Sequence, residues 1–118
     1  MKILLIFNRE PYDGTDVTFN GLRLASQLKE DNHEVRIFLI NDSVDLARSV
    51  NIKNPDYDQD LSMLLKSIIN DGIEVKACGS CETRCGLYKN QPYFEGVEKS
   101  NMQTLSFWVT DSDRVINL

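Results

Sequence analysis

All three cysteines of this 118-residue chain lie in one short segment, KACGSCETRCGL, at residues 76–87. Cys78, Cys81 and Cys85 follow the spacing C-x-x-C-x-x-x-C. A thiolate is a strong nucleophile and a metal ligand, and two thiols at C-x-x-C spacing can also form a disulfide. Because the number of cysteines is odd, at least one thiol stays outside any internal disulfide. This segment is therefore the chain's main candidate for chemistry.

Four interpretations of the segment are open. A thiolate could accept a sulfane sulfur as a persulfide and pass it on. Cys78 and Cys81 could form a dithiol–disulfide couple, although C-G-S-C lacks the proline of the thioredoxin motif. A tetrahedral zinc site needs four ligands, so a carboxylate or a second chain would have to contribute. The single histidine, His33, is expected in a turn at the other end of the strands. Finally, the cysteines could be structural or incidental.

The segments that must position these thiols alternate between strands and helices. Nearly continuous apolar runs predict buried strands, and apolar residues at helical spacing predict helices. The predicted strands cover 2–8, 34–40, 73–78, 97–99 and 114–118. The predicted helices cover roughly 16–30, a short stretch at 44–49, and longer stretches at 61–71 and 101–111. Strands that alternate with helices favour a parallel sheet, and hence an α/β fold.

Caps and apolar faces refine the predicted helices. Asp58 or Asp60 can cap the helix that begins near residue 61, Gly72 can end it, and Ser43 can cap the short helix. Ser100 and Gln103 have capping-box spacing ahead of the last helix. The first helix is expected to bury one set of residues, namely Val17, Gly21, Leu24, Ala25 and Leu28. The last helix is expected to bury another set, namely Met102, Leu105, Trp108 and Val109.

The predicted fold places Cys78 at the carboxyl end of the third strand, where α/β proteins collect ligands and reactive groups. Gly79 would allow a sharp turn, and Ser80 could cap a short helix over 81–85. The helix N-terminus would favour a thiolate at Cys78 and Cys81. Arg84 would add to this effect and Glu82 would oppose it. Cys78 is thus the first candidate nucleophile, with Cys81 in an assisting role.

Polar residues elsewhere are weaker candidates. Arg9, Glu10 and Asp16 follow the first strand and could face the same edge as Cys78, but each is more simply a solvated loop residue. His33 and Asp42 are most simply turn residues.

Charge and composition exclude several classes of protein. The formal net charge is −5, which disfavours nucleic acid as a partner. No apolar run is long enough for a membrane span or has the form of a signal peptide, so we expect a cytoplasmic protein with a single domain over 1–118. In that compartment thiols stay mostly reduced.

The order of motifs resembles the small DsrE/DsrF-like proteins. The resemblance rests on VKACGSCETRCGL at 75–87, on EGVEKSNMQTLSFWVTDSDRVINL at 95–118, and on GLRLASQL with HEVRIFLINDSV in the first half. It implies a three-layer α/β/α sandwich with a five-stranded parallel sheet. It also implies sulfur relay, in which Cys78 corresponds to the acceptor cysteine and Cys81 to a second cysteine of some members. Implied partners are sulfur-donor or sulfur-carrier proteins and further copies of the chain, as a trimer or hexamer, with no organic cofactor.

Overall fold

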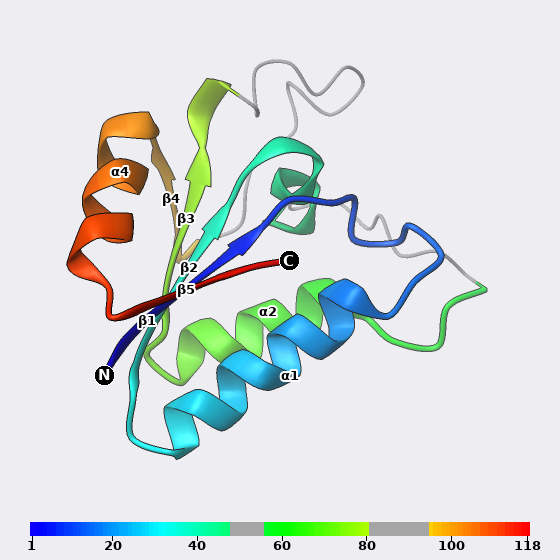
Figure 1. Cartoon of the computed structure of the whole chain (residues 1–118). Helices are drawn as coiled ribbons and strands as arrows, with labels where there is room; N and C mark the ends of the chain where they lie inside the picture. The colour runs from blue at the N-terminus through cyan, green and yellow to red at the C-terminus, as the bar shows by residue number, and fades with distance from the viewer. Residues whose placement is uncertain (48–55, 81–94) are drawn as a thin grey trace.

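Five parallel strands form the central sheet of the computed structural model, which describes residues 1–47, 56–80 and 95–118. The strands are β1 (Lys2–Phe7), β2 (Glu34–Leu39), β3 (Glu74–Cys78), β4 (Val97–Ser100) and β5 (Arg114–Asn117). Their order across the sheet is β4-β3-β2-β1-β5 (Figure 1). The first strand therefore lies beside the last one. All five predicted strands are confirmed, each to within one residue at either end.

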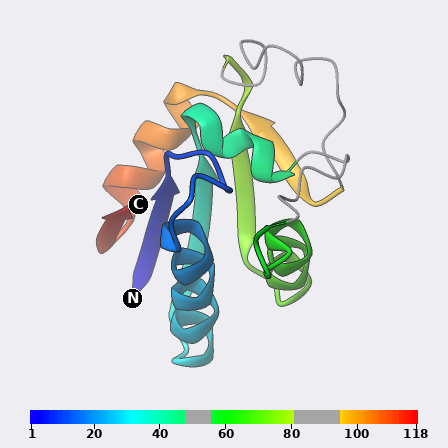
Figure 2. The same cartoon turned by 90° about the vertical axis from the view of Figure 1, so that its right-hand side faces the viewer.

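Helices cover both faces of the sheet, so the predicted three-layer α/β/α sandwich is confirmed. Helices α1 (Val17–Glu30) and α2 (Leu61–Asn70) lie side by side on one face, and α4 (Met102–Asp111) covers the other (Figure 2). A 3-10 helix, η1 (Asn41–Ala47), follows β2. Among the described residues, none of these helices combines the length and the apolar character needed to span a bilayer.

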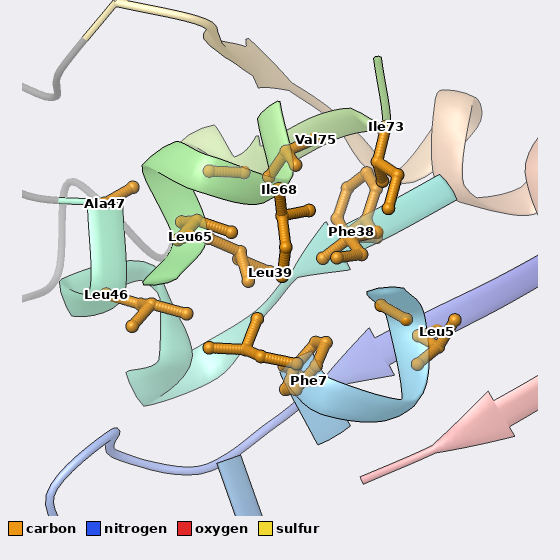
Figure 3. Packing of buried hydrophobic residues seen from close by; sticks show 14 of the residues in the cluster. Leu5, Phe7, Phe38, Leu39, Leu46, Ala47, Leu65, Ile68, Ile73 and Val75 are labelled. Carbon is orange, nitrogen blue, oxygen red and sulfur yellow. The ribbon is translucent and has the colours of Figure 1, made fainter. Parts of the chain in front are cut away.

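The main hydrophobic core lies between the sheet and the layer formed by α1 and α2. Strand residues such as Phe7 and Leu39 meet Leu65 and Ile68 of α2 there, and all four are buried (Figure 3). Figure 3 also shows Leu46 of η1 beside this cluster. Burial of such large side chains is the main stabilising term for a domain of this size.

The buried face of α1 agrees with the predicted one in part. Gly21 and Ala25 are buried as predicted, but Leu24 is 38% exposed, whereas Leu22 is fully buried. The helix packs closely against the sheet at Gly21, where a Cβ atom would lie 2.6 Å from Cε1 of Phe7. The contact face therefore lies toward Leu22 and away from Leu24.

The N-terminus of α4 also differs from the prediction. Its N-cap is Asn101, whose side-chain oxygen accepts a hydrogen bond from the backbone N–H of Thr104 at 3.0 Å. Ser100 instead ends β4. Leu105 and Trp108 are buried as predicted, but Met102 is 59% exposed and Val109 is also exposed. The prediction of a four-residue apolar face was wrong because α4 contacts the sheet along a narrower strip.

Ser43 does not cap a helix that starts after it. The 3-10 helix η1 begins at Asn41, and the buried hydroxyl of Ser43 lies 2.6 Å from the carbonyl oxygen of Phe7 and 2.7 Å from that of Ile40. The side chain thus links the chain after β2 to the end of β1. Residues 48 and 49 of the predicted helix lie outside the described residues.

The limits of α2 were predicted correctly. Asp60 is its N-cap, and the carboxylate accepts a hydrogen bond from the backbone N–H of Met63 at 3.2 Å. Gly72 follows the helix with a φ of +94°, a conformation that favours glycine. This turn directs the chain into β3 and hence toward Cys78.

Candidate functional site

Cys78 ends β3 at the edge of the sheet where the carboxyl ends of all five strands meet. It lies opposite Ser100 in the pairing of β3 with β4. The loop after β1 and the 3-10 helix after β2 border the same edge. The structure therefore places Cys78 where the sequence predicted it, at the position in α/β folds that most often holds ligands.

The thiol of Cys78 is shielded from solvent in this conformation. The residue is 3% exposed, and its Sγ lies 3.3 Å from the hydroxyl oxygen of Ser80. Either atom can donate in this contact, so Ser80 can donate to the sulfur when it is a thiolate. Such a hydrogen bond stabilises the charged form of sulfur. The contact is therefore suited to a reactive cysteine, although the burial limits access to it.

Gly79 and Ser80 are already helical, so Ser80 is not the cap of the helix that was predicted over 81–85. The chain changes direction at Gly79, from β3 into a helical turn, but Gly79 is not among the described glycines with positive φ, so the turn needs no conformation special to glycine. Lack of space disfavours a side chain at position 79. A Cβ on Gly79 would lie 3.1 Å from the carbonyl oxygen of Ser100 and 3.1 Å from Cε of Lys99. The backbone after Cys78 thus packs closely against the end of β4.

Cys81 and Cys85, like Glu82 and Arg84, lie outside the described residues. Their distances from Cys78 are therefore not part of the site geometry. Among the residues that the structure does describe, no three His, Cys, Asp or Glu side chains come together as a metal-binding group.

Lys76 precedes Cys78 by two residues on β3 and had not been singled out from the sequence. Its ammonium group lies 5.3 Å from the centre of the Trp108 ring and 3.3 Å from a carboxylate oxygen of Glu98. Because alternate residues of a strand share a face, Lys76 and Cys78 both lie on the α4 side of the sheet. The sequence does contain a feature that could have identified Lys76, because it is the one charged residue in the apolar stretch VKAC at the end of a buried strand.

Arg36 on β2 is a second cation beneath α4. Its guanidinium lies 4.9 Å from the centre of the Trp108 ring, donates to the hydroxyl of Ser112 at 2.9 Å and pairs with Asp111 at 3.3 Å. Trp108 also meets Phe38 edge-on, with ring centres 6.0 Å apart. The indole therefore belongs to the core, as predicted, but its neighbours are charged as well as apolar.

The other predicted candidates have partners of their own in this structure. Arg9 pairs with Asp13 at 3.0 Å, and Asp16 accepts a hydrogen bond from the hydroxyl of Tyr57 at 2.8 Å. Glu10 is exposed. These residues belong to the loop after β1, and β2 separates that strand from β3. The solvated-loop interpretation therefore agrees with the structure.

His33 lies in the connection between α1 and β2, as expected, whereas Asp42 lies in the 3-10 helix η1 and not in a turn. Nδ1 of His33 lies 3.2 Å from the amino group of Met1, at the edge of the sheet opposite Cys78. Asp42 is exposed in the first turn of η1.

Two tyrosines fasten the loop after β1 to the start of α2. The rings of Tyr12 and Tyr57 meet edge-on with centres 5.8 Å apart, and the hydroxyl oxygen of Tyr12 accepts a hydrogen bond from the backbone N–H of Leu61 at 3.0 Å. Burial raises the pKa of Tyr12. Burial, together with the hydrogen bond to Asp16, raises the pKa of Tyr57 to about 12. Both phenols therefore stay neutral at physiological pH.

Comparisons with known proteins agree on one family. The model of the DsrE/DsrF-like family matches residues 1–118. The uncharacterized protein MK0008 of Methanopyrus kandleri is 39% identical over 114 residues, which cover 97% of this chain and 91% of that protein. The protein YchN of Escherichia coli is 30% identical over 117 residues, which cover 98% of this chain and 97% of YchN.

Solved structures support the same fold. The crystal structure of YchN from Escherichia coli superposes with a TM-score of 0.85 at 29% identity, and the match covers 100% of this chain and 99% of that one. A conserved protein of unknown function from Bacteroides thetaiotaomicron gives a TM-score of 0.72 at 18% identity, which bears on the fold alone.

Proposed function

Because the chain belongs to the DsrE/DsrF-like family, a family of sulfur-relay type, we propose that it carries sulfane sulfur as a persulfide on Cys78. The single observation that supports this most is the position of Cys78, at the carboxyl end of β3 with a hydroxyl 3.3 Å from its sulfur. The proposal includes a cytoplasmic location, where thiols stay mostly reduced.

The chemistry is a transfer between thiols without net oxidation. The thiolate of Cys78 attacks the outer sulfur of a donor persulfide, R–S–SH. The S–S bond of the donor breaks, R–S⁻ leaves, and Cys78 becomes Cys–S–SH. In the second half, an acceptor thiolate attacks the outer sulfur of this persulfide and regenerates the Cys78 thiolate. Each half forms one S–S bond and breaks one, so no cofactor is required.

Cys81 has an assisting role in this proposal. Its thiolate attacks the inner sulfur of the persulfide, Sγ of Cys78, so that the S–S bond to the outer sulfur breaks, hydrosulfide leaves and a Cys78–Cys81 disulfide forms. The proposed partners are sulfur-donor and sulfur-carrier proteins, together with further copies of this chain in a trimer or hexamer. Light scattering of the purified protein in solution tests the assembly, and a monomer would contradict it.

The burial of Cys78 favours one alternative function. A thiol that is 3% exposed could be a packing residue in a non-catalytic binding module. A C-x-x-C thiol–disulfide oxidoreductase is the other alternative. The relay requires that the Cys78 sulfur become accessible to its donor, whereas the packing role does not.

One mass-spectrometric experiment separates these functions. The reduced protein is incubated with inorganic polysulfide, and its intact mass is measured for the wild type and for Cys78→Ser, Cys81→Ser and Cys85→Ser. We expect an added sulfur atom in the wild type and in Cys85→Ser, the matched control, and none in Cys78→Ser. No added sulfur in the wild type would exclude the relay. A loss of two hydrogens on mild oxidation, abolished in Cys78→Ser and Cys81→Ser, together with no added sulfur in the wild type or in Cys81→Ser, would instead support the oxidoreductase.

A further inference from the structure

The two faces of the sheet differ in chemical character near Cys78. On β2 and β3, the residues that face α1 and α2 are all apolar and buried, namely Val35, Ile37, Leu39, Val75 and Ala77. The alternate residues face α4, and they include Arg36 and Lys76 as well as Cys78. A sheet that is covered by helices on both faces does not need charged residues there, so these cations call for an explanation.

Both cations are largely removed from water. The side chain of Lys76 is 15% exposed, and Arg36 is buried. Each lies near the face of the Trp108 ring, which attracts cations through its quadrupole. Lys76 has Glu98 as its ion-pair partner, but the Glu98 side chain is 67% exposed. Water therefore screens the carboxylate more than it screens the ammonium group.

Stability does not account for these charges. Removing charges from water is costly, and a shielded ion pair is often no more stable than well-packed apolar residues in its place. In the part of the chain that the structure describes, Nε of Arg36 is also one of the buried side-chain atoms without a hydrogen-bond partner. A methionine at position 76 would suit this environment at least as well. Because the paired carboxylate of Glu98 is mostly exposed, the cation is better explained by a second negatively charged group on the shielded side of Lys76.

Cys78 is the nucleophilic group that lies next to Lys76 on the same face. The Cα atoms of alternate strand residues are roughly 6.6–6.8 Å apart, and the Lys76 ammonium group lies on this face beside Trp108 and Glu98. A cation near a thiol, in a site with little water, favours the charged form of the thiol. The persulfide that the proposed relay forms is also an anion at neutral pH, because persulfides are more acidic than thiols. The same cation would thus stabilise the sulfur before and after loading.

We propose that Lys76 is a positioning residue that holds negative charge on the sulfur of Cys78, with Glu98 and the Trp108 ring keeping its ammonium group in place. This inference rests on the proposed persulfide function, because that function requires a thiolate at Cys78. The Lys76 ammonium group would explain how the buried Cys78 thiol becomes a thiolate. The inference concerns the ionisation of Cys78 itself, and that property can be measured without any sulfur transfer.

Charged residues lie on the elements packed around β3, and most of them are acidic. They are Arg36 on β2, Asp42 and Asp45 on η1, Glu74 on β3 itself, Glu98 and Lys99 on β4, and Asp111 on α4. Glu74 and Asp111 lie with Arg36 near the amino ends of the strands, at the edge of the sheet opposite Cys78. A carboxylate close to the sulfur would oppose a thiolate at Cys78. Asp111 is the only acidic or basic residue of α4, and it pairs with Arg36. Lys99 points to the other face of the sheet, since it pairs with Ala77.

The experiment follows the ultraviolet absorbance of the thiolate as the pH is raised. It uses a Cys81→Ser/Cys85→Ser background, in which Cys78 is the only thiol, and subtracts the signal of the variant without cysteines. Absorbance requires no reagent to reach the buried sulfur. We expect Lys76→Met to raise the midpoint of thiolate formation by about one pH unit, or tenfold in the thiolate fraction near neutral pH, and Lys76→Arg to restore most of it.

Two further variants separate the electrostatic effect from a structural one. Glu98→Gln removes an opposing charge and should lower the midpoint, a change that mere loss of packing would not produce. Lys29→Met changes the net charge equally at an exposed position near the end of α1, at the edge of the sheet opposite Cys78, and we expect a smaller shift. An unchanged midpoint in Lys76→Met, equal shifts in Lys76→Met and Lys29→Met, or no thiolate in the unsubstituted background up to about pH 10 would overturn the inference.

Sulfur loading by polysulfide is measured on the same proteins, so that the two proposals can fail separately. A shifted midpoint together with no loading of the wild type would leave the role of Lys76 intact and remove the relay. Normal loading of the wild type together with an unchanged midpoint in Lys76→Met would support the relay and exclude the role of Lys76.

Discussion

The backbone of Gly21 in α1 lies directly against the ring of Phe7 in β1. A Cβ at position 21 would be 2.6 Å from Cε1 of Phe7 and 2.7 Å from Cδ1 of Leu118. No real Cβ contact is that short, so a larger residue must displace the helix or the ring. Gly21 therefore sets the distance between α1 and the centre of the sheet.

We expect Gly21→Ala to lower the free energy of unfolding. Overpacking costs about 1–3 kcal/mol, whereas the higher helix propensity of alanine returns about 1 kcal/mol at most. Urea denaturation measures the difference. Asn20→Ala is the matched control, because it changes helix propensity at the adjacent exposed position without a clash and removes only an exposed hydrogen bond from Arg23. A Gly21→Ala protein more stable than Asn20→Ala would contradict the close packing.

Asn101 and Ser100 offer a direct test of where α4 begins. Asn101→Ala removes the side chain that accepts a hydrogen bond from Thr104, so we expect a loss of about 1 kcal/mol in the free energy of unfolding. Ser100→Ala should cost less, because Ser100 lies in β4 and not at the cap. Thermal and urea unfolding of the two variants give the comparison. A larger loss for Ser100→Ala would restore the cap predicted from the sequence.

The Tyr57 phenol provides a pH-dependent prediction. Its pKa is raised to about 12 by burial and by the hydrogen bond to Asp16. A folded pKa above the unfolded value means that the group stabilises the fold below about pH 10, and that this contribution is lost as the pH rises through the folded pKa. We expect Asp16→Asn to lower the Tyr57 pKa. The difference in tyrosinate absorbance between each protein and its Tyr57→Phe counterpart measures it, and an unchanged pKa would contradict the hydrogen bond.

Local patterns in the sequence were sufficient for the strands and for the position of Cys78. The apolar runs around Leu4, Ile37 and Val75 had to be buried on both faces, which required a parallel sheet. Asp60 and Gly72 carry strong local preferences, and both ends of α2 followed from them. Such features depend on neighbours in the sequence, and so they could be predicted without a structure.

The features that were missed depend on residues far apart in the sequence. Leu24 and Leu22 are equally hydrophobic, and which of them is buried depends on how α1 packs on the sheet, where Gly21 meets Phe7. Arg36 and Lys76 looked like ordinary cations within strands, because their shared partner Trp108 lies on a distant helix. The contact between the Ser43 hydroxyl and the carbonyl of Phe7 was also missed, because these two residues are far apart in the sequence. Hydropathy and capping rules contain no term for such contacts.

The pairing of β1 with β5 has a consequence for folding. Ile3 and Leu4 of β1 pair with Arg114 and Val115 of β5, so β1 receives one of its two neighbours from the strand of this sheet that is synthesised after the other four. Until then, the backbone of β1 presents an unpaired edge, which can pair with strands of other chains. Contacts between residues so far apart also slow folding. The nascent chain is therefore most prone to aggregation, and most in need of a chaperone, before residues 114–117 are synthesised.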